Sequence, residues 1–262
     1  MKNLNQLLDI ALQAANAASG KVLQIYQKDF TVDYKEDKSP LTEADEVAHQ
    51  IIYDYLNDLG YPVISEESRS DESMDINQDT NRFWLVDPLD GTKEFIKKNG
   101  EFTINIALIE NNRPILGVVA IPAQNKVYYA IKNQGAYKIQ NGERPKIACS
   151  SMPDLTKATI AVSRSHLKEE DKNFIEKNQI AHTKPLGSAL KYCEIAEGMV
   201  DLSIRFTPLM QWDLAASDIL VHEAGGKVLD FSNKLYQYDI KNSNEALIDG
   251  LMVTNGILSP YF

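Results

Sequence analysis

The sequence predicts an α+β first half followed by an α/β second half, joined as one large unit or as two tightly packed ones. Two helical patterns open the chain, and β-rich runs separated by short turn sequences follow them. From about residue 150 strands alternate with helices instead, which is typical of α/β structure. No internal repeat or low-complexity linker separates the halves, and 262 residues are enough to bury a large core.

Two amphipathic helices are expected at the start of the chain. Apolar residues recur at helical spacing over residues 4–26, which predicts one long helix with a single buried face. A second helix is predicted to have Ser39 as its N-cap and Pro40 as its first helical residue. Its apolar stripe runs over residues 47–59, and Gly60 is expected to end it.

A buried strand and an antiparallel meander are expected next. A short apolar run at residues 61–64 leads into an acidic loop, and the polar stretch up to about residue 81 is expected to lie in solvent. Residues 83–86 are predicted to form a buried strand that ends at Asp87. The meander consists of β-rich runs separated by turn sequences, at residues 103–109, 115–121, 126–131 and 136–139.

The second half is predicted to alternate strands and helices. Its strands are expected at residues 159–162, near His182, at residues 200–206 and at residues 227–231, the last strand of the chain. Its helices are expected at residues 168–178, 188–197 and 213–224, the last of them closed by Gly225 and Gly226.

The composition restricts the possible function classes. The apolar fraction of 44% and the charged fraction of 24% are those of an ordinary globular protein. The formal net charge of −10 argues against nucleic acid as a partner, because affinity for a polyanion comes from clustered Lys and Arg. Cys149 and Cys193 have neither zinc-site nor disulfide-framework spacing, which favours a reducing compartment. With no leader-like segment and no membrane-spanning apolar run, we expect a cytoplasmic protein.

A short acidic motif carries the strongest chemical signal. Residues 87–92, Asp-Pro-Leu-Asp-Gly-Thr, follow an apolar strand and place two carboxylates three residues apart. Pro88 stiffens the turn, so the carbonyl of Leu89 can point the same way as the carboxylates. Such oxygen ligands suit magnesium, and the amides of Gly91 and Thr92 can bind an anion. Taken alone, the motif also fits an ordinary Pro-Asp-Gly turn.

Two further carboxylates are placed where they can join this motif. Glu66 follows a short apolar run, although an acidic pair in a polar loop is usually only solvated. Asp213 stands where a helix N-cap is expected, and accepting the first helical amides is its ordinary role. A third strand-end carboxylate is nevertheless what a second cation would need, as in two-metal phosphatases.

Candidate substrate-binding residues lie mainly in the second half of the chain. Gly187 and Ser188 precede a helix and present amides and a hydroxyl to an anion or a sugar, although a simple Ser cap also explains them. Lys93, Lys191 and Arg205 can meet a second phosphate, although lone cationic side chains more often lie in water.

Three motifs together resemble the inositol monophosphatase superfamily of lithium-sensitive phosphatases. They are Glu66-Glu67-Ser68, the motif at residues 87–92, and Trp212-Asp213-Leu214-Ala215-Ala216, in this order, and the resemblance covers nearly the whole chain. Further segments look like the CysQ branch, which comprises 3′(2′),5′-bisphosphate nucleotidases. These segments are residues 38–45, 90–96, 100–107 and 162–166.

The resemblance implies a layered αβαβα sandwich that forms a single catalytic unit over residues 1–262. Its α+β half, at about residues 1–145, would bind metal, and its α/β half, at about residues 146–262, would bind substrate. Two or three magnesium ions, with manganese as the alternative, would be held by Glu66, Asp87, the carbonyl of Leu89, Asp90 and Asp213. The implied catalytic residues, which orient or deprotonate the attacking water, are Asp45, Thr92 and Glu66. The implied substrate contacts are Gly91, Thr92, Gly187, Ser188, Lys191, Arg205 and Asp213.

The implied reaction is magnesium-dependent removal of the 3′-phosphate of adenosine 3′,5′-bisphosphate (PAP) in sulfur assimilation and PAP recycling, with PAPS as a further candidate substrate. Arg205 favours this reaction over the alternative of an inositol or sugar phosphatase, because a cation suits a second phosphate better than a neutral polyol. A non-catalytic nucleotide sensor is the remaining alternative. Where relatives often have Gly-Ser-Ser and Ala-Ala-Gly, the chain has Ala189 and Ser217, and neither departure removes an expected metal ligand. A monomer or homodimer is expected, with peripheral association at the cytoplasmic face of the inner membrane as an alternative location.

Overall fold

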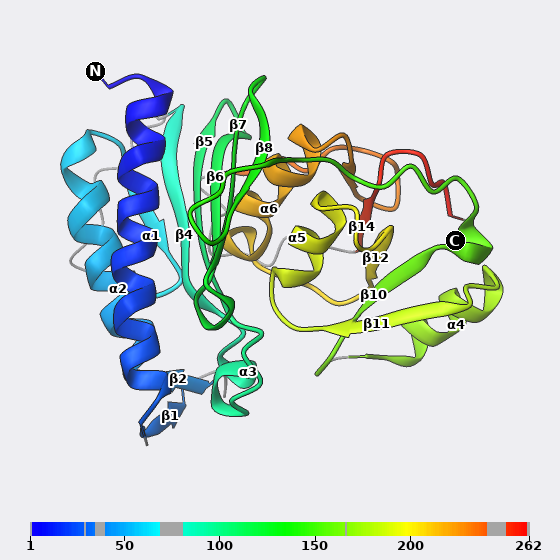
Figure 1. The fold of residues 1–262 in the computed structure, drawn as a ribbon, viewed down its shortest axis with the longest axis horizontal. Helices are drawn as coiled ribbons and strands as arrows, with labels where there is room; N and C mark the ends of the chain where they lie inside the picture. Colours follow the sequence, from blue (N-terminus) through cyan, green and yellow to red (C-terminus); the bar gives the residue numbers. More distant parts are fainter. Residues whose placement is uncertain are drawn as a thin grey trace.

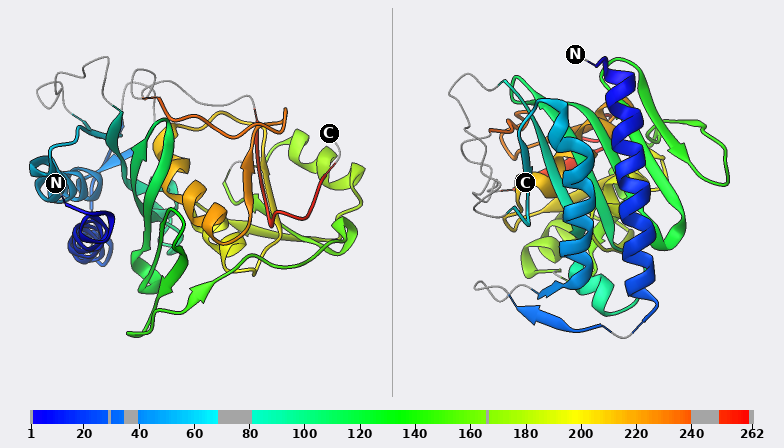
Figure 2. Two further views of the ribbon diagram at one scale, coloured as in Figure 1. Left: turned by 90° about the horizontal axis from the view of Figure 1, so that it is seen from above. Right: turned by 90° about the vertical axis from the view of Figure 1, so that its left-hand side faces the viewer.

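The computed structural model describes residues 2–28, 30–34, 40–68, 81–165, 167–239 and 250–260. These residues form alternating layers of helices and sheets (Figure 1). The outer layers are α1 (Leu4–Tyr26) and α2 (Glu43–Leu56) on one side and α4 (Glu169–Lys177) on the other, and α5 (Leu190–Ala196) and α6 (Gln211–Glu223) lie between two sheets. The layered αβαβα sandwich expected from the sequence is therefore confirmed. Figure 2 shows α1 and α2 side by side in front of the first sheet.

The first sheet has seven strands in the order β3-β4-β5-β6-β7-β8-β9. Their bounds are β3 (Val63–Ser65), β4 (Arg82–Asp90), β5 (Thr103–Glu110), β6 (Arg113–Ile121), β7 (Lys126–Ile131), β8 (Gly135–Ile139) and β9 (Lys146–Ile147). All neighbouring pairs are antiparallel except β3 and β4, which are parallel. The predicted meander corresponds to β5–β8 and is confirmed.

The first sheet is buried on both faces, because alternate side chains of a strand point to opposite sides. In β5, Ile104, Ile106 and Leu108 belong to the hydrophobic cluster beneath α1 and α2. Ala107 and Ile109 belong to the cluster on the opposite face, which includes α5 and α6. This two-sided burial explains why residues 106–109 of the strand form a continuous apolar run.

The second sheet has the order β11-β10-β12-β14-β13. Its strands are β10 (Thr159–Ser163), β11 (His182–Leu186), β12 (Leu202–Arg205), β13 (Lys227–Leu229) and β14 (Leu251–Thr254). β10 is parallel to β11 and β12, whereas β14 is antiparallel to β12 and β13. The prediction that residues 227–231 form the last strand is wrong, since β14 follows and lies between β12 and β13.

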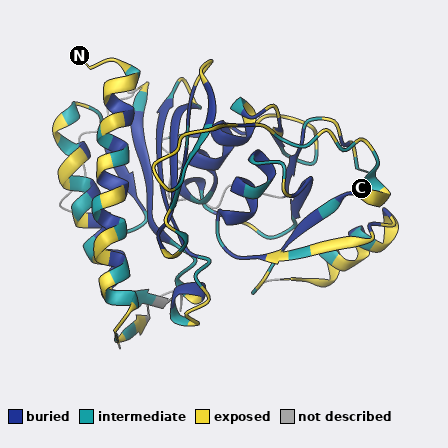
Figure 3. Cartoon of the chain, viewed as in Figure 1, coloured by how far each residue is buried: buried dark blue, intermediate teal, exposed yellow. Residues whose placement is uncertain are grey.

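The middle helix α6 is buried over nearly its whole surface, unlike the half-exposed α1 and α2 (Figure 3). It approaches β6 at Gly117, where an added Cβ atom would lie 2.5 Å from the carbonyl oxygen of Ala216 and 2.6 Å from Cγ2 of Ile219. No side chain fits between strand and helix at this point. The helix backbone therefore rests directly on the first sheet.

The second helix begins later than predicted. Ser39 lies outside the described residues, and Pro40 belongs to the short strand β2 (Pro40–Thr42), which pairs with β1 (Val32–Tyr34). Thr42 is the N-cap instead: its hydroxyl accepts the Ala44 N–H at 3.2 Å, and its own N–H donates to Asp45 at 2.8 Å. The structure therefore uses a Thr-x-x-Asp capping box in place of the predicted Ser-Pro start.

The second helical segment ends at Gly60. Gly60 follows the last helical turn, the 3₁₀ segment Asn57–Leu59, in a left-handed conformation with φ of 81°, as predicted for the end of the helix. The polar stretch expected in solvent falls largely on residues 69–80, which lie outside the described residues. None of the helices in the described part of the chain is both long and apolar enough to cross a membrane.

Candidate active site

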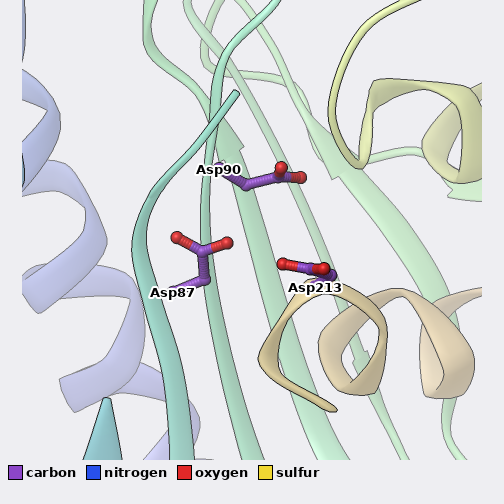
Figure 4. Close-up of side chains that lie close together, drawn as sticks. All are labelled: Asp87, Asp90 and Asp213. Carbon is purple, nitrogen blue, oxygen red and sulfur yellow. The ribbon is translucent and has the colours of Figure 1, made fainter. Parts of the chain in front are cut away.

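The acidic motif lies in an irregular end of β4 rather than in a turn after it. The strand continues beyond Asp87 to Asp90, and its pairing with β5 shifts register between these two residues. Pro88 has no N–H to donate to the ladder, and the Leu89 N–H instead donates to Oδ1 of Asp87 at 3.0 Å. In a regular strand residues three apart point to opposite faces. The register shift turns both carboxylates toward Asp213 (Figure 4).

Asp213 approaches the motif from the N-terminus of α6. It is the third helical residue rather than the predicted N-cap, because α6 begins at Gln211 after Met210. One of its carboxylate oxygens accepts the Met210 N–H at 2.9 Å, which fixes the side chain at the helix end. Ligand oxygens of Asp87, Asp90 and Asp213 all lie within 4.8 Å of one another. The short helix α3 (Thr92–Ile96) begins at the last residue of the motif.

The carboxylates of the cluster repel one another, and burial further disfavours their charged forms. Burial, followed by repulsion from Glu66, raises the pKa of Asp87 well above its usual value. Burial and then the neighbouring Asp90 raise the pKa of Asp213 to about 7. Oδ2 of Asp87 is buried and has no hydrogen-bond partner among the described residues. A cation at this point would relieve both the repulsion and the unpaired oxygen.

The donor set fits a hard divalent cation. Glu66 lines the same pocket as Asp90 and Asp213, and its backbone N–H donates to the carbonyl of Val86 at 3.1 Å, which holds it beside β4. The carbonyl oxygen of Leu89 lies 3.4 Å from the hydroxyl oxygen of Thr92. Carboxylate and carbonyl oxygens without nitrogen or sulfur ligands suit magnesium, manganese or calcium.

A threonine–aspartate pair lies beside the cluster. The hydroxyl oxygen of Thr92 is 3.2 Å from Oδ1 of Asp45. The other carboxylate oxygen of Asp45 accepts the N–H and the hydroxyl of Thr42 at 2.8 and 2.6 Å. Because Asp45 is buried and held in this way, it can accept the Thr92 proton and leave the Thr92 oxygen free to accept one from a water molecule.

A pocket of about 180 Å³ opens over these residues. The sequence-predicted residues that line it are Glu66, Asp90, Gly91, Thr92, Lys93, Gly187, Ser188, Lys191, Arg205 and Asp213. Its other lining residues are Glu94, Ser163, Tyr192 and Leu209, to which sequence reasoning gave no site role. Tyr192 and Leu209 carry no local signal, because an apolar residue in a helix or loop looks the same whether it faces a core or a pocket.

One side of the pocket is cationic. Lys191 is buried, and its ammonium donates to the carbonyl of Ser188. Burial lowers the pKa of Lys191 to about 8, with Asp90 acting in the opposite direction. The Arg205 guanidinium donates to the carbonyls of Thr207 and Pro208 at 3.2 and 3.1 Å, which fixes it at the pocket wall. The pocket is thus lined by carboxylates and by cations that interact with them.

Comparison with known proteins gives a consistent result. Residues 3–255 match the model of the inositol monophosphatase family. The 3′(2′),5′-bisphosphate nucleotidase CysQ of Escherichia coli (strain K12) is 41% identical over 241 residues, which cover 90% of this chain and 96% of that protein. The CysQ nucleotidase of Haemophilus influenzae is 34% identical over 257 residues, covering 97% of this chain and 92% of that protein.

Solved structures agree with these relatives. The crystal structure of CysQ from Bacteroides thetaiotaomicron, a member of the inositol monophosphatase family, aligns with a TM-score of 0.81 at 34% identity, over 97% of this chain and 98% of that chain. The inositol monophosphatase TM1415 of Thermotoga maritima aligns with a TM-score of 0.79 at 28% identity, over 96% of this chain and 93% of that chain.

Proposed function

Because the chain belongs to the inositol monophosphatase family, we propose that it is a divalent-cation-dependent 3′(2′),5′-bisphosphate nucleotidase. Its proposed reaction is hydrolysis of the 3′-phosphate of PAP to give AMP and inorganic phosphate, with PAPS as a second substrate. The identity of 41% to the CysQ nucleotidase of E. coli over 90% of the chain supports this choice within the family.

The observation that carries the proposal is the pairing of opposite charges in one pocket. The carboxylate cluster suits cations that bind the phosphate to be cleaved, and Lys191 and Arg205 line the same pocket. A bisphosphate nucleotide would bring a second phosphate to these cations, and phosphates form strong charge-assisted hydrogen bonds with Arg and Lys. A monophosphate of a neutral polyol would leave them without an anion.

Magnesium is the proposed cofactor, as two or three ions, with manganese as a substitute. The residues that would hold it are Glu66, Asp87, the carbonyl of Leu89, Asp90 and Asp213. The unpaired Oδ2 atom of Asp87 and the all-oxygen donor set support this assignment. Bound cations would supply the positive charge that screens the substrate phosphate from these carboxylates and stabilises the leaving ribose oxygen.

The chain's own residues would orient the water and the substrate. Thr92, with its proton on the side of Asp45, would hold the attacking water through its hydroxyl oxygen, and Glu66 would assist. The amides of Gly91 and Thr92 would bind the reacting phosphate, while Gly187, Ser188, Lys191, Arg205 and Asp213 would contact the rest of the nucleotide. In this proposal the first half, about residues 1–145, binds metal and the second half, about residues 146–262, binds substrate, within one catalytic unit.

Phosphate release tests the proposal directly. Purified protein is assayed with PAP, PAPS, inositol 1-phosphate and fructose 1,6-bisphosphate, in magnesium, in EDTA, and in magnesium with added lithium. We expect turnover of PAP with magnesium, loss of turnover in EDTA and inhibition by lithium. Preference for the inositol or fructose ester would contradict the nucleotidase assignment, and PAP binding without any turnover would indicate a sensor.

A further inference from the structure

A strained loop holds Ser188, whose carbonyl accepts a hydrogen bond from Lys191, one of the two cations proposed to meet the second phosphate. Ser188, in the loop between β11 and α5, has a left-handed backbone with φ of 44°. A non-glycine residue keeps this conformation only when its surroundings enforce it. Two hydrogen bonds from the flanking amides enforce it here. The Gly187 N–H donates to Glu101 at 2.8 Å, and the Ala189 N–H donates to Asp90 at 2.6 Å. Both acceptors come from the metal-binding half of the chain.

Glu101 is itself fixed by an arginine from the other half. Both of its carboxylate oxygens accept hydrogen bonds from Arg164, at 2.6 Å from Nε and 2.7 Å from Nη2. Arg164 also donates from Nη2 to the carbonyl of Pro185 at 2.6 Å and from its backbone N–H to the carbonyl of Leu186 at 3.2 Å. The arginine thus joins Glu101 to the end of β11, directly before the strained loop. Such two-point carboxylate pairs fix orientation as well as distance.

At Gly187 the loop also packs closely against the side chain of Glu94 and the backbone of Glu101. A Cβ atom on Gly187 would lie 2.6 Å from Cγ of Glu94 and 3.1 Å from the carbonyl oxygen of Glu101. Glycine is therefore needed for the Gly187 amide to reach Glu101. The side chain of Glu101 is 13% exposed, so its contact with the Gly187 N–H is partly shielded from water.

We propose that Glu101, clamped by Arg164, is a positioning residue that holds the Ser188 loop in the shape that binds the second phosphate. Glu101 does not line the pocket and acts through Gly187 and Ser188. This inference rests on the proposed nucleotidase function, because it concerns the part of the substrate beyond the reacting phosphate.

The test compares two substrates and two measurements. Glu101→Ala removes the contacts of Glu101 with Arg164 and with the Gly187 N–H. Glu101→Gln keeps an acceptor for the Gly187 N–H. Glu110→Ala is the matched control: it breaks an Arg82–Glu110 pair at the opposite end of β5, away from the pocket. KM and kcat are measured for PAP and for adenosine 3′-monophosphate, which lacks the second phosphate. Hydrogen–deuterium exchange of residues 187–190 reports the loop without any substrate, and thermal unfolding confirms that each variant is folded.

For Glu101→Ala we expect KM for PAP to rise about tenfold while kcat and KM for adenosine 3′-monophosphate change by less than about twofold. Exchange at residues 187–190 should rise, Glu101→Gln should fall between the wild type and Glu101→Ala, and Glu110→Ala should behave as wild type.

Unchanged exchange in Glu101→Ala would overturn the inference, and so would faster exchange with an unchanged KM for PAP. A wild-type protein that does not prefer PAP to the monophosphate would contradict the proposed function instead. In that case the inference about the second phosphate also fails, and the exchange measurement still shows whether Glu101 holds the loop.

Discussion

The hydroxyl oxygen of Thr92 lies 3.2 Å from Oδ1 of Asp45, and the two residues belong to the first turns of different helices, α3 and α2. The contact joins residues 47 positions apart in the chain. Asp45 is fixed by the capping box of α2, so a local helix start supplies a rigid proton acceptor for a threonine on another element. The Thr92 hydroxyl can donate to Asp45 or, at 3.4 Å, to the carbonyl of Leu89. If the Leu89 carbonyl binds a cation as proposed, Asp45 becomes the acceptor and the lone pairs of Thr92 serve a water molecule.

Thr92→Val tests this pair, because valine keeps the size and branching of threonine without the hydroxyl. We expect kcat for PAP to fall by about 100-fold, the usual contribution of a general-base arrangement, with little change in thermal stability. Thr92→Ser, which keeps the hydroxyl, should retain most of the activity. Initial rates in saturating magnesium provide the measurement, and a valine variant within threefold of wild type would contradict the assignment.

Metal affinity should depend on pH through Asp213. Its pKa is raised to about 7 by burial and by Asp90, so the metal-free protein holds a proton near this site below pH 7. That proton must leave before a cation binds, and affinity should therefore fall as pH drops from 8 to 6, by at most about tenfold per pH unit for each proton released. Calorimetric titration with magnesium measures it, and an affinity independent of pH would show that no proton is displaced.

Asp213 should also make the stability of the metal-free protein depend on pH. Metal affinity is expected to rise with pH, whereas this stability is expected to fall. A carboxyl whose folded pKa is raised binds its proton more tightly in the native than in the unfolded state, so stability should fall as pH rises from about 4 through 7. We expect added magnesium to restore stability at pH 8 more than at pH 6. Thermal unfolding with and without magnesium measures this, and Asp213→Asn, which cannot ionise, should show a smaller pH dependence than wild type.

Lys191 should matter for the second phosphate rather than for the chemistry. Replacing it by Met keeps the aliphatic stem and removes the buried cation, so KM for PAP should rise by about tenfold or more. Adenosine 3′-monophosphate should be hydrolysed at close to the wild-type rate by the variant. An equal effect on both substrates would mean that Lys191 supports the reacting phosphate or the fold instead.

A partly buried ion pair joins the middle layer to the first sheet. Arg113 of β6 contacts Asp218 of α6 at 2.8 Å, and the Tyr238 hydroxyl donates to the same carboxylate at 2.8 Å. Asp218→Ala leaves the arginine and the tyrosine without their partner and should lower the free energy of unfolding by about 3 kcal/mol. Glu169→Ala breaks an exposed pair with Lys172 and should change it by less than about 0.5 kcal/mol. Urea unfolding of both variants checks the contrast.

Periodicity and turn chemistry were enough to predict most of the fold. The long first helix, the meander and the alternating second half all depend on local patterns of apolar residues, and the structure contains them. Strand β14 was missed because its four residues carry too little pattern of their own, and its place is decided by pairing with β12 and β13. The start of α2 was misplaced because Ser39, followed by Pro40, and Thr42 are both acceptable N-cap residues in the sequence. The hydrogen bond from the Thr42 N–H to Asp45 identifies Thr42 as the N-cap.

The site was predictable in its parts but not in its geometry. The sequence indicates acidic residues at element ends, yet a spacing of three along a strand would separate Asp87 and Asp90 without the register shift at Pro88. The contact of Glu101 with Arg164 joins residues 63 positions apart and leaves no local signal. Such long-range pairs depend on how the helix and sheet layers pack against one another. This packing cannot be predicted from the local patterns of a single sequence.

The direct contact of α6 with β6 at Gly117 has a consequence for the proposed metal site. Asp213 lies on α6 one turn before Ala216, the residue that faces Gly117, whereas Asp87 and Asp90 lie on the sheet itself. Because Gly117 has no side chain, α6 lies directly on β6. This close approach sets the distance between Asp213 and the other two carboxylates. Any larger residue at position 117 would push α6 away from the sheet and increase the distance between Asp213 and the other two carboxylates. A substitution in the hydrophobic core would therefore change the affinity for the cation.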